Sequence, residues 1–470
     1  MRNQYLALVP LFCWLGACSS PSADCVPGVQ EACTCPNGAP SAKVCGADRA
    51  FGACLCDTID GGGLDAGSMD ATASDAAGSD GAASDSSTLD ASMIGDMSTV
   101  DAGPASVLGT YYAGGYHTCH VRPTGDVACW GRNESSEVGA SGSMSTSAHV
   151  IGSLAGVQTM AAGGGYSCAV TEMGSVKCWG ENTFRELGDG STTERSAAVT
   201  VSSFSNAVQV DVSFLLDTDA VIAGNHHSCA TQDDGDVFCW GNNESGQLGD
   251  GTTMARNTAV SVSGLGFIVS VAVGNAHSCA LSNTGTVECW GTNSEYERGS
   301  SSALLGSSPN TVSLGDTIAQ LAAGAEFTCA LRDDGQIQCW GKSNYGQLGH
   351  SYVGTPPDRD TPQSVSGITD AVSLCAGAEF ACALRGTGAV QCWGRNHRWQ
   401  LGDGTTTDQD VPQTVDGIDD ATSITCGDVH ACATREDNSV YCWGDDTRGQ
   451  LGTGSTQSSP QTSAVHCVNQ

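Results

Sequence analysis

The sequence is short of positive charge. Its 470 residues contain 18 Lys and Arg against 51 Asp and Glu, a formal net charge of -33, and the only lysines are Lys43, Lys177 and Lys342. A surface this acidic repels phosphate backbones and anionic lipid headgroups. We therefore expect no nucleic-acid partner.

The usual sequence signatures of catalysis are also missing. There is no Gly-x-Ser-x-Gly elbow, no phosphate-binding glycine loop and no His-x-x-x-His zinc pair. We predict no catalytic, cofactor-binding or metal-binding residues and a protein that is not an enzyme. The alternative is a catalytic site assembled from loops that lie far apart in the sequence.

The apolar stretch at residues 5–14 is too short to span a bilayer, which takes about 20 apolar residues. Arg2 precedes it and Leu15-Gly16-Ala17-Cys18 follows, an order that resembles the signal peptide and lipobox of bacterial lipoproteins. The resemblance implies removal of residues 1–17, acylation of Cys18 and a lipid-anchored protein of the bacterial envelope. Ser19, in place of Asp, favours the outer membrane. An ordinary secretory signal with a chance cysteine is the alternative.

Cysteine is abundant, with 25 residues, which is typical of an oxidising compartment. Besides Cys18, six cysteines lie within residues 18–57 among Gly, Pro and Ala: Cys25, Cys33, Cys35, Cys45, Cys54 and Cys56. Since this segment has little apolar material to bury, we predict a small unit held together by disulfides. The sequence does not choose among the possible pairings, and a zinc site is the competing interpretation.

Residues 58–105 contain no Lys, Arg or aromatic residue. Aspartate recurs there every five residues, at Asp60, Asp65, Asp70, Asp75, Asp80, Asp85 and Asp90. This period is neither helical nor that of a strand, so we predict a disordered, self-repelling linker. A calcium-binding repeat is the alternative, but the clustered ligands that it needs are missing.

The rest of the chain, residues 106–470, repeats one unit seven times. The first cysteine of each unit is followed ten residues later by a second cysteine and then by Trp-Gly; the pairs are Cys119 and Cys129, Cys168 and Cys178, Cys229 and Cys239, Cys279 and Cys289, Cys329 and Cys339, Cys382 and Cys392, and Cys432 and Cys442. A period near fifty residues is typical of propellers and solenoids.

Each unit predicts two strands that form a hairpin around its cysteines. A glycine stands five residues before each first cysteine, Gly224 in the third unit, and lets the chain turn. A second glycine stands six residues after each first cysteine, except in the last unit, where Asn438 replaces it. In the third unit the three-residue loop Asp233-Asp234-Gly235 places Cys229 opposite Cys239, where a disulfide can close. We predict seven such bridges; metal binding by the pairs is the competing interpretation.

The recurring Trp-Gly-x-Asn-x-x-Gly-Gln-Leu-Gly run, seen at Trp240 to Gly249, resembles the regulator-of-chromosome-condensation repeat family. The resemblance implies an all-β, seven-bladed β-propeller over roughly residues 106–467. Some members of that family bind or inhibit other proteins through one face of the propeller. Guanine-nucleotide exchange, the best-known activity of the family, fits poorly with export, acidity and disulfides.

Two residues before each first cysteine stands a flat side chain, namely His117, Tyr166, His227, His277, Phe327, Phe380 or His430. Since Phe and Tyr replace His freely, we predict packing residues. A metal-binding or acid–base ring is the alternative.

One interval is about eleven residues longer than the others, and we place the extra residues within 204–219. They include Phe214, Leu215 and Leu216, which we predict form a partner-binding loop; an added strand is the alternative.

Three further cysteines are Cys375, Cys426 and Cys467. Cys375 and Cys426 lie at adjacent offsets of equivalent strands, so we expect them to face opposite ways. Without Cys13 and with Cys18 acylated, an odd number of cysteines remains, so at least one is a free thiol or bonds another chain.

Together these features predict a membrane-anchored surface lipoprotein whose propeller binds an unknown protein or glycan. The alternative is an enzyme that acts on envelope polysaccharide or peptide at the propeller centre, which paired inward-facing carboxylates would favour.

Overall fold

The computed structural model describes residues 30–34, 40–44, 109–140, 142–214, 226–302, 306–352 and 357–464. The chain divides into two compact units, residues 1–89 and 90–470. In the first, β1 (Gln30–Thr34) and β2 (Pro40–Val44) form an antiparallel pair. The predicted signal peptide, Cys18 and linker lie outside the described residues.

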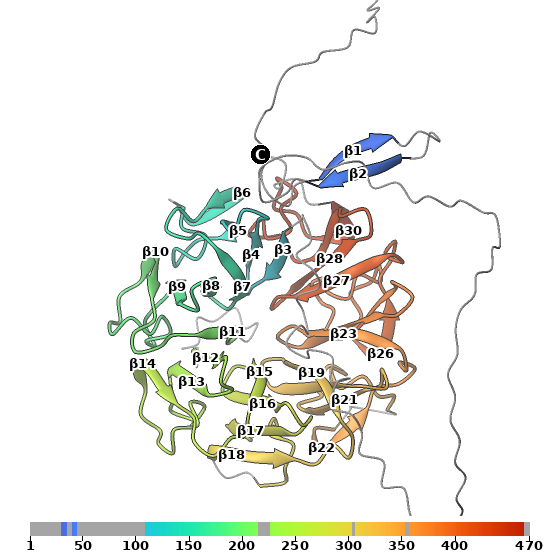
Figure 1. Ribbon diagram of the computed structural model, residues 1–470. Helices are drawn as coiled ribbons and strands as arrows, with labels where there is room; N and C mark the ends of the chain where they lie inside the picture. Colours follow the sequence, from blue (N-terminus) through green and yellow to red (C-terminus); the bar gives the residue numbers. More distant parts are fainter. Residues whose placement is uncertain are drawn as a thin grey trace, which may run out of the picture. The chain divides into compact units, whose positions relative to one another are not determined.

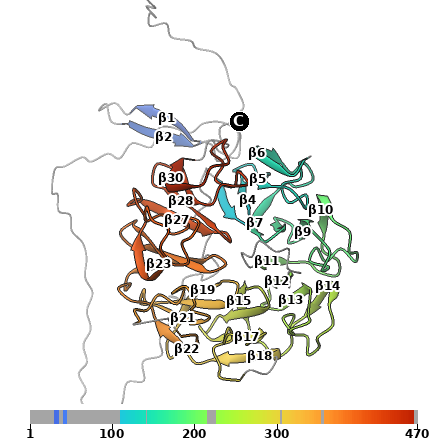
Figure 2. The ribbon, with the colours of Figure 1, turned by 180° about the vertical axis from the view of Figure 1, so that it is seen from behind.

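The second unit is a seven-bladed β-propeller (Figure 1). Each blade is an antiparallel sheet of four strands that follow one another in sequence, and the described residues contain no helix. We number the blades 1 to 7 in sequence order. The reverse view shows the same circular order, with blade 1 beside blade 7 (Figure 2). The predicted all-β propeller with hairpin disulfides is confirmed.

In each blade the four strands are ordered from the centre of the propeller outward. The innermost strands are β3 (Thr110–Ala113), β7 (Val157–Ala162), β11 (Ala207–Val212), β15 (Ile268–Val273), β19 (Ile318–Ala323), β23 (Ala371–Ala376) and β27 (Ala421–Cys426). The second strands are β4 (His117–Val121), β8 (Tyr166–Thr171), β12 (His227–Gln232), β16 (His277–Ser282), β20 (Phe327–Arg332), β24 (Phe380–Arg385) and β28 (His430–Arg435).

The third strands are β5 (Val127–Arg132), β9 (Val176–Gly180), β13 (Val237–Gly241), β17 (Val287–Gly291), β21 (Ile337–Gly341), β25 (Val390–Gly394) and β29 (Val440–Gly444). The outermost strands are β6 (Met144–Val150), β10 (Arg195–Thr200), β14 (Arg256–Ser261), β18 (Gly306–Val312), β22 (Arg359–Ser364), β26 (Gln409–Thr414) and β30 (Ser459–Ala464). The second and third strands are the cysteine hairpin that the sequence predicts.

The hairpin geometry explains the cysteine spacing. Cys229 pairs with Cys239 across β12 and β13, and their Cα atoms lie 4.1 Å apart. Gln232 and Asp236 close the three-residue turn, in which Gly235 has a φ of 85°. In blade 7 the same position is Asn438, with a φ of 68°, which Asn tolerates better than most residues. All seven predicted pairs form intrablade disulfides.

The hydrophobic core lies between neighbouring blades. Leu331, Ile337 and Leu348 of blade 5 pack with Leu374 and Trp393 of blade 6, and all are buried. Because a single four-stranded sheet cannot cover both of its faces, each blade depends on its neighbours for burial. A single blade is therefore not a stable unit by itself.

A hydrogen bond from each repeated tryptophan joins neighbouring blades. Its Nε1 donates to a backbone carbonyl of the preceding blade, as when Trp290 donates to Gln247 at 2.8 Å. The other six bonds are Trp179 to Glu137, Trp240 to Glu186, Trp340 to Glu297, Trp393 to Gln347, Trp443 to Gln400 and, across the point of closure, Trp130 to Gln450. The ring therefore closes with the same bond that joins its internal blades.

Candidate functional site: the blade junctions and their variable face

The flat residues two before each first cysteine lie at the blade junctions. Where this residue is His or Tyr, it faces a hydroxyl one position before the first cysteine of the next blade; the pairs are His117 with Ser167, Tyr166 with Ser228, His227 with Ser278, His277 with Thr328, and His430 with Thr118. Where it is Phe, at Phe327 and Phe380, the next blade has Ala381 or Ala431. Packing alone is therefore an incomplete account of these residues.

These histidines are neutral parts of the frame. Burial lowers the pKa of His117 and His277 to about 3 and that of His430 to about 4. The hydroxyl of Thr328 donates to the carbonyl of Glu297, so it accepts from Nε2 of His277. These imidazole rings are fully buried, as expected for side chains that only join two blades.

A second set of positions varies from blade to blade. In every blade, two positions are counted from the first cysteine: three residues before it and thirteen residues after it. The carbonyl of the earlier residue accepts a hydrogen bond from the backbone N–H of the later one, so both lie at the same end of the hairpin. We call these the variable pairs: Tyr116 and Arg132, Gly165 and Glu181, His226 and Asn242, Ala276 and Thr292, Glu326 and Lys342, Glu379 and Arg395, and Val429 and Asp445.

Both members of the variable pair are charged in blades 5 and 6. Lys342 forms an ion pair with Glu326, and Arg395 forms one with Glu379. Arg398 joins this set through Asp445, with Nη1 and Oδ2 2.6 Å apart. Most of these side chains are partly exposed, with Lys342 17% and Arg395 19% accessible. They combine charges held in fixed positions with access to solvent, as a binding surface requires.

Burial raises the pKa of three carboxyl groups near this surface. The pKa of Glu297 rises to about 7, and those of Glu295 and Glu379 rise by desolvation as well. Glu297 is 1% exposed, and its carboxylate accepts the backbone N–H of Glu295 at 3.0 Å. This carboxyl therefore supports a loop and has no open path to a substrate.

The insertion of blade 3 begins on the same face. In blade 1, Gly114 N donates to His117 O across a tight turn; in blade 3, Ser213 N donates to His227 O instead. Ser213 therefore takes the place that we assigned to Gly224, and the extra residues follow it. The predicted range of the insertion, 204–219, therefore begins too early. Phe214 is half-buried at the start of the insertion, whereas Leu215, Leu216 and Gly224 lie outside the described residues.

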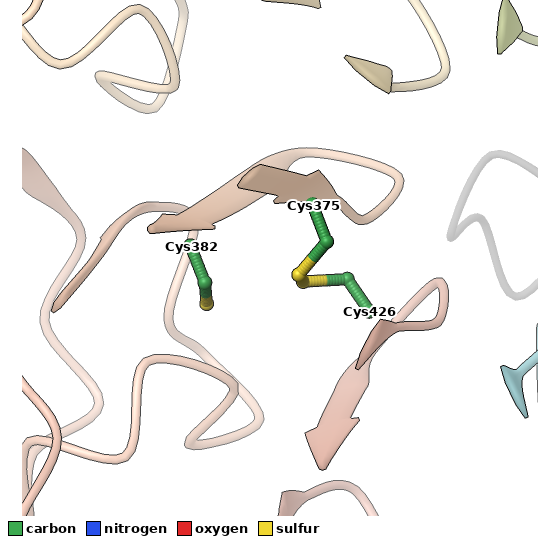
Figure 3. Close-up of side chains that lie close together, drawn as sticks. All are labelled: Cys375, Cys382 and Cys426. Carbon is green, nitrogen blue, oxygen red and sulfur yellow. A yellow bond between two sulfur atoms is a disulfide. The ribbon is translucent and has the colours of Figure 1, made fainter. Parts of the chain in front are cut away.

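Cys375 and Cys426 form an eighth disulfide in the propeller, between blades 6 and 7 (Figure 3). Cys375 is opposite Cys382 in its sheet, while Cys426 lies one step further along the equivalent strand, opposite Ala431. Opposite faces of neighbouring sheets meet at a junction, so an offset of one residue points both sulfurs into the same space. The expectation of opposite directions overlooked this consequence. Cys467 lies outside the described residues.

The sequence contained unused signals for both sets of junction residues. The residue two before the first cysteine of one repeat varies together with the residue one before the first cysteine of the next repeat. His or Tyr is followed by a hydroxyl residue, and Phe is followed by Ala. Comparing the repeats column by column shows charge at the variable pairs within an otherwise uniform unit. Both signals need the circular order of the blades before they can be interpreted.

Seven consecutive four-stranded blades closed by identical junction contacts define a β-propeller whose frame repeats and whose one face varies. A model of the RCC1-like domain matches residues 215–469, more than half of the sequence, and a model of the regulator of chromosome condensation (RCC1) repeat matches residues 157–186. The chain belongs to the RCC1-like propeller family.

Solved structures agree with this fold. Human WBSCR16 has a TM-score of 0.63 at 22% identity, covering 72% of this chain and 93% of its own. Yeast RCC1 (Prp20), solved bound to Kap60, has a TM-score of 0.64 at 21% identity, covering 72% and 83%. Prp20p of Saccharomyces cerevisiae, which was characterised for its binding to Gsp1p and histones, has a TM-score of 0.62 at 21% identity, covering 72% and 85%. None of the curated protein sequences compared with the chain matches it.

Proposed function

We propose that this protein is a lipid-anchored surface lipoprotein whose propeller binds a partner protein through the variable face. The observation that carries the proposal is the division of the propeller into a repeated frame and a varied face, with the insertion of blade 3 starting on that face. Propellers bind partners through loops at one end of the blades, where sequence can change without loss of the core. The solved relatives that bind other proteins support this class of function.

The membrane anchor in this proposal depends on Cys18. No helix within the described ranges is long and apolar enough to cross a membrane. Acyl chains on an N-terminal cysteine would hold the protein on a bilayer without a spanning segment. Radiolabelled palmitate should enter the wild-type protein in a bacterial host and not the Cys18→Ala variant. Equal labelling of both proteins would reject the anchor.

The binding face is tested by two variants and two controls. The first replaces residues 214–225 with one glycine, which restores the turn length of blade 1, and the second neutralises Glu326 and Lys342 by substitution with Gln. The controls, Glu172→Gln and Asp233→Asn, lie at exposed positions beside the opposite turns of the blades. Partners should crosslink to wild type and to the controls but not to the face variants. Equal crosslinking by all four variants would refute the assignment of this face.

Raised carboxyl pKa values favour the enzyme alternative, and two of these carboxyl groups, Glu297 and Glu379, lie near the variable face. Glu297 is buried and Glu379 is held by Arg395, so neither carboxyl is positioned for proton transfer to a substrate. The variable face therefore supports binding better than catalysis.

A further inference from the structure

Two carboxylates and one imidazole meet at the junction of blades 2 and 3. The residues are Glu181, Glu186 and His226, and one potential ligand atom from each lies within 4.8 Å of the other two. Nδ1 of His226 is 3.3 Å from Oε1 of Glu186 and 3.9 Å from Oε2 of Glu181. The side chain of Glu186 is fully buried and that of His226 is 2% exposed, while that of Glu181 is 26% exposed.

The fold does not require a carboxylate at position 186. One oxygen of this side chain accepts the backbone N–H two residues earlier, at Phe184, and in four other blades a glutamine makes the same bond: Gln247, Gln347, Gln400 and Gln450. The second oxygen of Glu186 is therefore available for another role. In blade 1 the equivalent Glu137 uses its second oxygen to bind Arg132 at 2.6 Å.

Few donors serve the acceptors of this cluster. Arg132 acts electrostatically on Glu181, but its Nε donates to Glu137. Nδ1 of a histidine carries one proton at most, so it cannot donate fully to both Glu181 and Glu186. Nε2 of His226 is buried and has no hydrogen-bond partner among the described residues. A buried carboxylate is costly unless a cation or several donors compensate it. The group that best satisfies two carboxylates and one imidazole nitrogen at once is a metal ion.

We propose that Glu181, Glu186 and His226 bind a divalent first-row transition metal ion, with Zn²⁺ as the reference case. Ligands at bond lengths of about 2.1 Å in a tetrahedral site lie roughly 3.4 Å apart, close to the 3.3 Å and 3.9 Å between Nδ1 and the two oxygens. A single nitrogen and two carboxylate oxygens suit such ions, and three protein ligands leave a coordination position for water or another oxygen ligand. Glu181 is accessible enough to admit the ion and adjust its side chain.

This site goes beyond the proposed binding function and does not depend on it. Glu181 and His226 belong to the variable pairs, and His226 directly precedes β12 at the end of the insertion. This site is not apparent from the sequence, because its ligands come from two repeats and the insertion hides their relation. Metal binding can be measured on the purified chain without any partner.

The repeat supplies variants that should fold. At the junction of blades 3 and 4 the three equivalent residues are Asn242, Gln247 and Ala276. The substitutions Glu181→Asn, Glu186→Gln and His226→Ala therefore install side chains that the same frame already accepts. Glu297→Gln is the matched control, because it changes the equivalent buried carboxyl group of blade 4, which accepts the same backbone hydrogen bond.

The experiment is calorimetric titration of Zn²⁺ into the full chain after dialysis against a chelator, with free thiols blocked by iodoacetamide. Wild type and Glu297→Gln should bind one ion at this site, and X-ray absorption should show nitrogen and oxygen ligands. Each ligand variant should bind at least roughly 100-fold more weakly, since loss of a second-shell partner alone costs 10–100-fold. Absence of binding in wild type, or equal binding by the folded ligand variants, would overturn the proposal and leave His226 as a hydrogen-bond partner of Glu186.

Discussion

Nε2 of His430 in the last blade lies 2.8 Å from the hydroxyl oxygen of Thr118 in the first blade. The same hydroxyl donates to the carbonyl of Gln450, which also accepts from Trp130. These contacts copy those at the internal junctions, for example His277 with Thr328. The two ends of the propeller are therefore joined by the chemistry of the repeat itself, without exchange of a strand between blades.

Matched junction pairs predict a compensating double mutant. Thr328→Ala leaves the buried Nε2–H of His277 without an acceptor and should destabilise the fold by about 1–3 kcal/mol. Adding His277→Phe creates the Phe–Ala pair found at Phe327 and Ala381, so the double mutant should regain most of that loss. Urea unfolding of wild type, both single mutants and the double mutant measures the coupling. Strictly additive effects would show that the pairs are independent.

The buried histidines predict instability in acid. Their pKa values, about 3 to 4 in the folded state, lie below the ordinary value of 6.5, so the unfolded chain binds more protons between these limits. Their contribution to stability is complete above pH 6.5 and is lost as the pH falls towards 4. His277→Phe combined with Thr328→Ala should reduce the proton uptake on unfolding by about one near pH 5. An unchanged pH dependence of the urea midpoint would contradict this assignment.

Glu297 predicts the opposite trend at high pH. Its pKa is raised from 4.5 to about 7, so the folded state holds the proton more tightly and stability falls as the pH rises through this range. Glu297→Gln, which matches four other blades, should stabilise the protein by about 1–3 kcal/mol at pH 8 and by little at pH 4. Thermal unfolding at both pH values measures the difference. A gain of equal size at pH 4 would indicate a cause other than ionisation.

The bridge between Cys375 and Cys426 predicts a large effect for one disulfide. It closes a segment with a sequence separation of 51, against 10 for an intrablade pair. Chain entropy gives about 4 kcal/mol for the longer loop and about 3 kcal/mol for the shorter one. Replacing Cys375 and Cys426 with Ala should therefore lower the unfolding midpoint more than replacing Cys119 and Cys129. The opposite order in guanidinium unfolding would contradict the estimate.

Sequence alone predicted the features that depend on one repeat. The Cys229–Cys239 register, the positive φ of Asn438 and the number of blades follow from local turn chemistry and periodicity. The insertion within blade 3 was misplaced: Gly224 has the expected spacing, yet Ser213 makes the turn bond and the extra residues follow it. Features that depend on two blades were missed. Cys375 and Cys426 lie at different offsets on equivalent strands of two blades. They meet only because neighbouring sheets present opposite faces to each other.

Peptide mapping of the oxidised, non-reduced protein tests most directly whether each blade of the propeller has its own disulfide. Proteolysis and mass spectrometry should recover the pair Cys119–Cys129 and its six equivalents within single repeats, together with Cys375–Cys426 between the last two. Recovery of Cys119 or its equivalents joined to cysteines of other repeats would contradict a propeller built from independently bridged blades.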